Sequence, residues 1–288
     1  TDIIWDFRMT KAFTCVLGGS ALALGGLQMQ TLFRNPLAGP DVLGLTSGAS
    51  LAVSLVYMSS AAGVSLFFIE SPWAVAIASS IGCFLVFLIM LAVSGRLKDN
   101  VSLLIVGLMV GAATSSIVSV LQYLSRAEDL QVYMIWTFGS LSSMSWTEIR
   151  VLAVIVIIGL AIAIINVKAL NVWLLGENYA QSLGVNIKQS RFLAILSASI
   201  LTGGVTAFCG PIAFVGLAVP HLVKLLIRTH NHKLLIPAVA VGGAVLLLAC
   251  DILAQVPGSS SILPINAITA LVGAPVVIWV IMRNKIIQ

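Results

Sequence analysis

The stretch "TLFRNPLAGPDVLGLTSGAS", from Thr31 to Ser50, interrupts a hydrophobic chain with two prolines, an arginine and an aspartate. The residues on both sides of it are apolar enough to cross a membrane. Pro36 is predicted to end the incoming helix, and Pro40 restricts the residue before it. Asp41 stands just ahead of the next apolar run, where an N-cap residue is expected. The pattern therefore predicts a tight turn that sends the chain back into the membrane.

The composition around this turn is that of a membrane protein with many spans. The chain has 288 residues, of which 59% are hydrophobic and 9% are charged, and its mean hydropathy is +1.10. Soluble domains carry about 25% charged residues. The apolar runs are long and continuous rather than alternating, which predicts an all-α fold and excludes a β-barrel. The net charge of +5 is attributed to loop topology, not to nucleic-acid binding.

Nine transmembrane segments are expected in a single domain covering residues 1–288. They lie near residues 12–30, 43–60, 73–94, 101–124, 147–167, 191–209, 211–228, 234–254 and 264–282. Gly210 and Pro211 divide the long apolar run 191–228, because proline cannot continue a helix and glycine permits a reversal. Residues 129–145 are too polar for a span and predict a short helix at the membrane interface.

Lys and Arg residues predict the orientation of the chain, since cytoplasmic loops carry an excess of them. With the 31–42 loop inside, eleven of the fifteen lie on the cytoplasmic side and four on the other. The inner set is Arg34, Arg96, Lys98, Lys168, Lys188, Arg191, Lys224, Arg228, Lys233, Arg283 and Lys285. The outer set is Arg8, Lys11, Arg126 and Arg150. This places Thr1 outside and the C-terminus in the cytoplasm, and it leads us to expect a further span before Thr1, ten in all.

The small residues and the cysteines are attributed to helix packing rather than to a binding or catalytic site. Gly44 and Gly48 are four residues apart, as are Gly107 and Gly111, and such spacing lets helices approach closely in lipid. The four cysteines, one in each of four apolar runs, have no metal or redox spacing and are expected to be buried. The chain contains no G-x-x-x-x-G-K-[ST] phosphate loop, so it does not bind ATP by that route.

The segment "LFRNPLAGPDVLG" resembles the signature loop of the FecCD-type permeases, the membrane subunits of type II ABC importers for iron chelates, haem and cobalamin. The resemblance implies that Asn35, Pro36, Leu37 and Ala38 lie beside the translocation path. Gln28, in the first span, is a further candidate for lining a polar path.

The longest polar segment on the predicted inner face is "GENYAQSLGVNIKQSR", from Gly176 to Arg191. Glu177, Ala180, Leu183 and Gly184 fit a short amphipathic helix ended by glycine, with Ala180 and Leu183 on one face. A solvated loop is the alternative. The resemblance implies that residues 176–190 hold the coupling helix that fits a groove on the ATPase.

Two later segments extend the resemblance. "GPIAFVGLAVPHLVKLL", from Gly210, has Lys224 where the family usually has arginine, and "LPINAITALVGAPVVIWVIMR" has Asn266 where it has glycine. His221 could be a ligand, a proton relay or a structural, helix-capping residue. His230 and His232 are close in sequence but give only weak evidence for a metal site, and no metal is assigned to the chain.

Charged residues also occur near the predicted outer surface. Asp251 is the only acid well inside a span, so it is either functional or paired locally. "DFRMTKAF" is similar to the family's R-x-P-R motif, which implies that Arg8 and Lys11 receive carboxylates of an external binding protein. The alternative is that both cations extend to lipid headgroups. Gln255 replaces a third cation of the family, so weaker docking is expected.

The resemblance implies a permease in the bacterial inner membrane that performs no covalent chemistry. The implied partners are a second copy of the chain, two ATPase subunits that bind ATP and magnesium, an external binding protein and membrane lipid; no nucleic acid and no cofactor in this chain are expected. A ferric siderophore or haem is the expected cargo, with cobalamin as the alternative. Other classes are a structural membrane protein and an ion-coupled transporter that uses Asp251 and His221.

Overall fold

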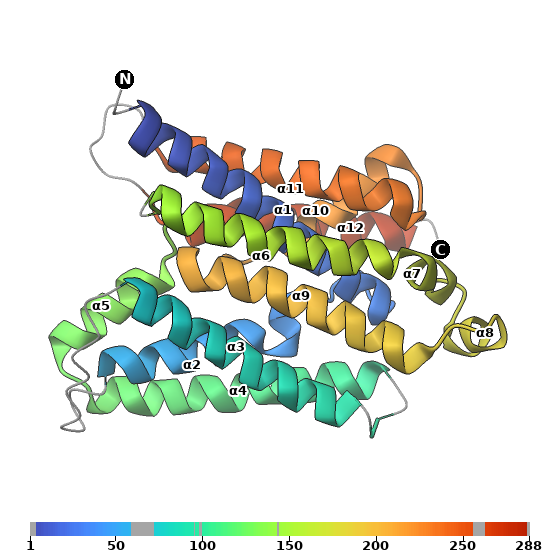
Figure 1. Cartoon of the computed structure of the whole chain (residues 1–288), viewed down its shortest axis with the longest axis horizontal. Helices are drawn as coiled ribbons and strands as arrows, with labels where there is room; N and C mark the ends of the chain where they lie inside the picture. The colour runs from blue at the N-terminus through green and yellow to red at the C-terminus, as the bar shows by residue number, and fades with distance from the viewer. Residues whose placement is uncertain are drawn as a thin grey trace.

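The computed structural model (Figure 1) is helical over most of the residues that it describes, which are 4–58, 72–94, 96–97, 100–142, 144–255 and 263–286. A π-helical turn, η1 (Ile4–Met9), precedes α1 (Thr10–Leu32), and a 3₁₀ turn, η2 (Pro40–Leu43), precedes α2 (Leu45–Met58). The remaining helices are α3 (Pro72–Ser94), α4 (Asn100–Leu124), α5 (Ala127–Thr137), α6 (Trp146–Ile165), α7 (Val167–Trp173), α8 (Glu177–Ser182), α9 (Ile187–Cys209), α10 (Val215–Ile227), α11 (His232–Ala254) and α12 (Ile265–Ile286). The all-helical prediction is confirmed for the described residues.

Helix α1 is the centre of the bundle. It packs against α6, α9, α10 and α11 (Figure 1), and every residue from Ala21 to Leu32 is buried. A helix that is apolar on all sides is stable only when other helices surround it. Helices α2 and α3 lie beside α9 on one side, with α4 packed against α2 and α3, while α10, α11 and α12 lie on the other side of the bundle.

Close helix contacts occur where glycines face each other. A Cβ atom on Gly26 of α1 would lie 1.6 Å from the carbonyl oxygen of Gly216 in α10, so only glycine fits there. Gly44, with a φ of +73°, faces Gly107 and Gly111 of α4. Gly48 of α2 instead lies against Gly82 of α3. The predicted helix contacts of these small residues are therefore confirmed, with α4 as the partner of Gly44 and α3 as the partner of Gly48.

Six described helices, α1, α3, α4, α6, α9 and α11, are long and apolar enough to cross a membrane. The other three predicted spans coincide with shorter apolar helices, in α2, α10 and the described apolar part of α12. The number of nine spans therefore stays a prediction. The segment expected at the interface does form a helix, α5.

The predicted span 211–228 is helical only from Val215 onward. Gly210 has a φ of +74° and Phe214 a φ of +67°, so the chain between them is not helical. The 13 residues of α10 extend about 20 Å, which is shorter than a bilayer core of about 30 Å. The side-chain oxygen of Asn266 accepts a hydrogen bond from the Ala213 N–H at 3.1 Å and satisfies backbone that no helix pairs.

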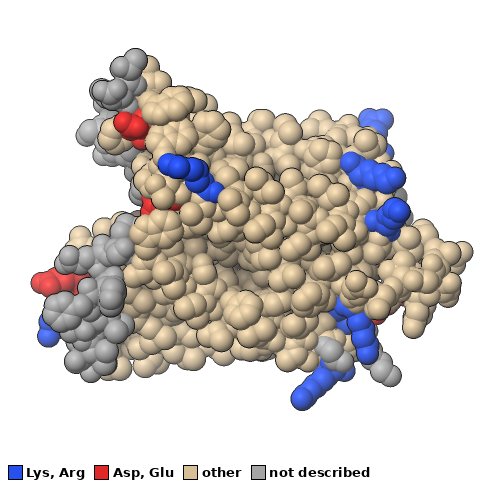
Figure 2. Space-filling model, in the orientation of Figure 1, with Lys and Arg blue, Asp and Glu red and all other residues tan. Residues whose placement is uncertain are grey.

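Charged side chains gather at the two ends of the bundle. Figure 2 shows several Lys and Arg side chains at the end formed by α7 and α8, here called the α8 end, and a broad uncharged surface between the ends. The opposite end, here called the α5 end, contains α5 and the first turns of α1. The cation-rich α8 end agrees with the excess of Lys and Arg in the loops that are predicted to be cytoplasmic. The orientation of the chain in the membrane stays a prediction.

Candidate functional site

The turn after α1 lies at the α8 end. The helix stops at Leu32, four residues before Pro36, and Arg34 adopts a left-handed conformation with a φ of +47°. The Asn35 side-chain oxygen then accepts a hydrogen bond from the Leu37 N–H at 2.9 Å. The prediction that Pro36 ends α1 is therefore wrong, because the reversal begins at Arg34 and the Asn35 side chain fixes the turn.

Asp41 is part of η2 rather than the N-cap of α2. Its carboxylate accepts a hydrogen bond from the Thr46 hydroxyl in the first turn of α2. Gly44, in the left-handed conformation, separates η2 from α2. Asp41 thus holds the two short helices together through a side-chain contact, and the N-cap prediction is wrong.

The residues predicted to line the path have different environments. Pro36 and Leu37 are exposed, Leu37 by 41%, and Asn35 is half-buried. Ala38 is fully buried in a hydrophobic cluster with Leu43 and Leu45. Asn35, Pro36 and Leu37 therefore have accessible surface, whereas Ala38 has none, and a place beside a translocation path stays a prediction for the first three.

Gln28 is also inside the subunit. Its exposure is 1%, and its side-chain nitrogen donates to the Ser197 hydroxyl of α9 at 2.9 Å. Ser197 in turn donates to the Gly159 carbonyl of α6 at 2.7 Å. This burial contradicts the prediction that Gln28 lines a polar path, because its hydrogen bonds connect α1, α9 and α6 in the core.

Helix α8 occupies the predicted coupling segment. Gly176 begins it with a φ of +111°, and Gly184 follows it with a φ of +82°, conformations that favour glycine at both positions. Ala180 is fully buried within the chain, whereas Leu183 is 58% exposed and Tyr179 is 62% exposed. Ala180 and Leu183 therefore do not share a face, and the surface that α8 offers to a partner is Tyr179 with Leu183.

Arg191 of α9 connects α8 to α3. Its Nη2 lies 3.1 Å from the Glu177 carboxylate, and its Nη1 donates to the carbonyls of Ser94 and Leu97 at 3.2 and 3.3 Å. The residue is 7% exposed. One feature of the sequence points to this contact: an arginine ends the polar segment and begins an apolar run.

A second polar contact joins α7 to α1 and α11. The His232 backbone N–H donates to the Asn171 side-chain oxygen at 2.8 Å, and its Nδ1 lies 2.8 Å from the same oxygen. Its Nε2 lies 2.8 Å from the Thr31 hydroxyl. His232 is 1% exposed, so it is a buried structural residue, and the described residues contain no group of three metal-ligating side chains.

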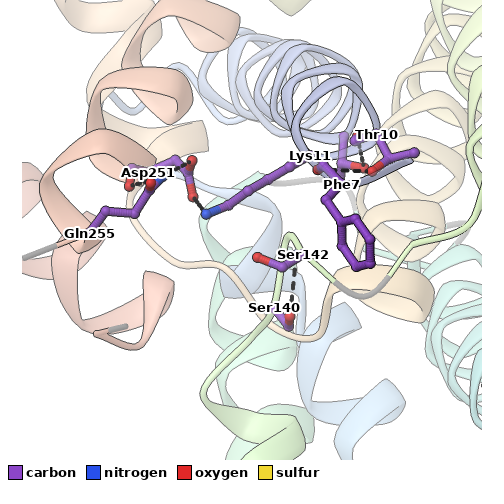
Figure 3. Close-up of polar contacts among 8 residues, drawn as sticks. Phe7, Thr10, Lys11, Ser140, Ser142, Asp251 and Gln255 are labelled. Atoms are coloured by element: carbon purple, nitrogen blue, oxygen red, sulfur yellow. Dashed lines mark hydrogen bonds and ion pairs between the residues drawn. The ribbon is translucent and has the colours of Figure 1, made fainter. Parts of the chain in front are cut away.

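Lys11 and Asp251 form an ion pair at the α5 end. Figure 3 shows the Lys11 Nζ directed at Asp251, 2.8 Å from its Oδ1, while the Gln255 side chain donates to Oδ2 at 3.0 Å. Both charged side chains are largely buried. Lys11 is therefore already paired within the chain and is not a free cation for an external protein. Asp251 has the local pairing that the sequence left as one of its two explanations.

Arg8 differs from Lys11 in its surroundings. It lies in η1, is exposed, and has no ion-pair partner among the described residues. Close to Lys11 is a pocket of about 290 Å³ lined by Ser140, Ser142 and Pro264. The α5 end thus contains both Arg8, an exposed cation without an ion-pair partner among the described residues, and a partly polar pocket.

His221 lies in the middle of α10, so it does not cap a helix. It is half-buried, and neither a hydrogen bond nor an ion pair joins it to another described residue. One turn further, Lys224 Nζ donates to the Gln30 side-chain oxygen at 3.1 Å, and Gln30 donates to the Leu217 carbonyl at 3.0 Å. The pair connects α10 to the end of α1.

All four cysteines, Cys15, Cys83, Cys209 and Cys250, are buried and unpaired, as expected for small apolar residues. The described side chains thus form buried polar contacts at both ends of the bundle, and Tyr179 and Leu183 are exposed at α8 and its C-cap. The six long apolar helices and the charged ends of the bundle place the chain in the class of membrane proteins with several spans.

Comparison with known proteins agrees with this class. The chain matches the model of the FecCD transport family over residues 1–283, and it belongs to that family. It is 34% identical to the hemin transport system permease protein HmuU of Yersinia pestis, covering 98% of this chain and 84% of the relative. It is 33% identical to the vitamin B12 import system permease protein BtuC of Vibrio cholerae, covering 98% and 83%.

A solved structure supports the fold. An inward-facing metal-chelate type ABC transporter superimposes with a TM-score of 0.89 at 29% identity, covering 98% of this chain and 88% of that one. PsaBC from Streptococcus pneumoniae superimposes with a TM-score of 0.61 at 17% identity, which shows a related fold alone. The chain is a membrane-spanning ABC transporter permease of the FecCD family.

Proposed function

We propose that this chain is the membrane subunit of a type II ABC importer that carries a metal chelate across the bacterial inner membrane. Two copies form the translocation path, two ATP-binding cassette subunits bind at the α8 end, and an external binding protein docks at the α5 end. ATP and magnesium belong to the cassette subunits, so the chain itself performs no covalent chemistry. The C-terminus lies in the cytoplasm.

The observation that carries this proposal is the exposed apolar surface of α8. Tyr179 and Leu183 are 62% and 58% exposed on a helix of six residues that projects from the cation-rich end of the bundle. Large apolar side chains that protrude outside the spans favour burial in a partner's groove. A short helix held between two glycine turns can transmit a displacement, which a flexible loop cannot.

Substitution of this surface tests the proposal. Leu183→Asp should prevent the cassette subunits from co-purifying with the permease, because an unpaired carboxylate would be buried at the contact at a cost of several kcal/mol. Ser182→Asp is the matched control on the same helix. Ala180→Asp is a poor test, because Ala180 is buried within the permease. Normal recruitment of the cassette subunits by the Leu183 variant would contradict the proposal.

The proposed cargo is a ferric siderophore or haem, and cobalamin is the alternative. The relatives named above transport hemin and vitamin B12 and are similar to this chain to nearly the same degree. Uptake of haemin, a ferric siderophore and cyanocobalamin into proteoliposomes, each with its binding protein, separates these cargoes. Uptake without ATP would instead support an ion-coupled transporter.

We propose that docking of the binding protein depends on Arg8, an exposed cation at the α5 end that has no ion-pair partner among the described residues. Exposed ion pairs are screened within about 8 Å at physiological ionic strength, so docking should weaken with salt. Arg8→Glu should slow association of the binding protein while leaving basal ATP hydrolysis unchanged. Arg126→Glu is the control, since Arg126 is an exposed cation of the predicted outer set. Unchanged association of the Arg8 variant would indicate that Arg8 only contacts lipid.

A further inference from the structure

Arg191 connects three segments that are far apart in the sequence. Its guanidinium contacts the carboxylate of Glu177 at the start of α8, the carbonyl of Ser94 at the end of α3, and the carbonyl of Leu97 just before α4. Its own backbone belongs to the first turns of α9. One side chain therefore joins α8 and α9 to the connection between α3 and α4.

These contacts hold the guanidinium firmly. Arg191 is 7% exposed and carries a permanent charge, so it must keep its partners to offset the cost of desolvation. The carbonyl of Ser94 belongs to the end of a helix, where backbone acceptors have no partner within the helix and the dipole favours a cation. The planar guanidinium can contact acceptors in several directions at once, which a lysine ammonium cannot do in the same geometry.

Helix α7, which precedes α8 in the chain, is also held in place by buried contacts. Trp173, the last residue of α7, is fully buried in a hydrophobic cluster with Leu32 and Ile195. Asn171 contacts His232, which in turn contacts Thr31 at the end of α1. Helix α8 is therefore held to α1 and α11 through α7, and to the end of α3 and the segment before α4 through Arg191.

We propose that Arg191 is a positioning residue that transmits displacement of α8 to the start of α4. Helix α4 begins three residues after Leu97 and is the least buried of the six long spans, so it has a large face free to contact a second copy or the path. A push on α8 moves the Glu177 carboxylate, and Arg191 passes that movement to the Ser94 and Leu97 carbonyls. This inference rests on the proposed role of α8 as the contact for the ATPase.

The test follows α4 directly and needs no knowledge of the cargo. Spin labels at Arg96, an exposed residue between α3 and α4, report the distance between the two copies in the assembled transporter. In the otherwise unmodified protein we expect this distance to change when ATP and vanadate trap the cassette subunits. Arg191→Lys should abolish the change while ATP hydrolysis continues, because the ammonium cannot hold Glu177 and both carbonyls together. Lys233→Gln, an exposed cation of α11 at the same end, should leave the change intact.

The outcomes separate the inference from the proposed function. If no cassette subunit assembles with the unmodified protein, the proposed function fails before any variant is measured. If assembly and the distance change are normal and Arg191→Lys retains the full change, the inference is overturned. Parallel losses of melting temperature, hydrolysis and distance change would also overturn it, because they indicate a purely structural residue. Should Arg191→Lys fail to fold, Glu177→Gln decides, with loss of the change supporting the inference and its retention overturning it.

Discussion

At the scale of single residues, the charged side chains buried in the described part of this permease have partners. Lys11 neutralises Asp251, and Arg191 neutralises Glu177. Isolated ionised groups are costly to desolvate, so these pairs are expected to matter most when one member is removed. The same reasoning separates Arg8, which is exposed, from Lys11, which is not.

Lys11→Gln should destabilise the protein, because it leaves the largely buried Asp251 carboxylate without its cation. The expected loss is about 3 kcal/mol in the free energy of unfolding. It would be measured as a lower melting temperature in detergent. The double variant Lys11→Met with Asp251→Leu should regain most of the loss, and Arg8→Gln should have little effect. A melting temperature of Lys11→Gln equal to that of the unmodified protein would show that the pair contributes nothing.

Gln28→Met should leave transport unchanged and reduce stability only slightly. Gln28 contributes one side-chain hydrogen bond to Ser197, and such interhelical bonds in membranes average about 0.6 kcal/mol. ATP-dependent uptake and the melting temperature are the two measurements. Ser197→Ala, which removes the other partner, is the matched comparison. Uptake that collapses in a normally folded Gln28 variant would restore a role in the translocation path.

At the scale of the elements, the close approach of α1 to other helices depends on glycine. Gly26 contacts the backbone of Gly216 in α10, where a methyl group has no space, whereas a Cβ on Gly18 would meet only side chains at 3.5 Å or more. Both glycines lie in the same helix and both are buried. They therefore provide a matched pair in which helix propensity is constant and only the space differs.

Gly26→Ala should force α1 and α10 apart and destabilise the protein, by about 1–3 kcal/mol for an overpacked site and more where backbone must move. Gly18→Ala should be neutral or stabilising by up to about 1 kcal/mol, because alanine favours a helix more than glycine does. Thermal unfolding of the two variants in parallel checks both expectations. Equal melting temperatures for the two would mean that the α1–α10 contact relaxes freely.

At the largest scale, the separation of charges between the two ends of the bundle predicts the orientation in the membrane. A cysteine at Gln181 on α8, in a version without the four native cysteines, should resist membrane-impermeant thiol reagents added outside intact cells. A cysteine at Glu128, at the beginning of α5, should react rapidly. Both side chains are exposed, so access alone determines the difference. Rapid labelling at Gln181 with protection at Glu128 would invert the predicted topology.

The amino-acid sequence alone is enough to identify the class of fold, most element positions and the family. Long apolar runs can be stable in a membrane only as helices, and the glycine–proline pair at Gly210 fixed the break between α9 and α10. The short helix α8 and its closing glycine were also visible, because amphipathic spacing and a left-handed turn are local properties. Local properties are encoded by neighbouring residues, so a single sequence is enough to find them.

The pairing of polar residues, in contrast, depends on how the helices pack in three dimensions. Ala180 was expected on the partner surface and is buried, Gln28 was expected in a path and bonds to α9, and Lys11 was expected to be free and pairs with Asp251. The contacts of Arg191 with Ser94 and Leu97 join positions almost one hundred residues apart. In a membrane helix nearly every face is apolar, so hydrophobic periodicity does not show which face meets protein and which meets lipid. Helix packing makes that choice, and it thereby determines the partner of each buried charge.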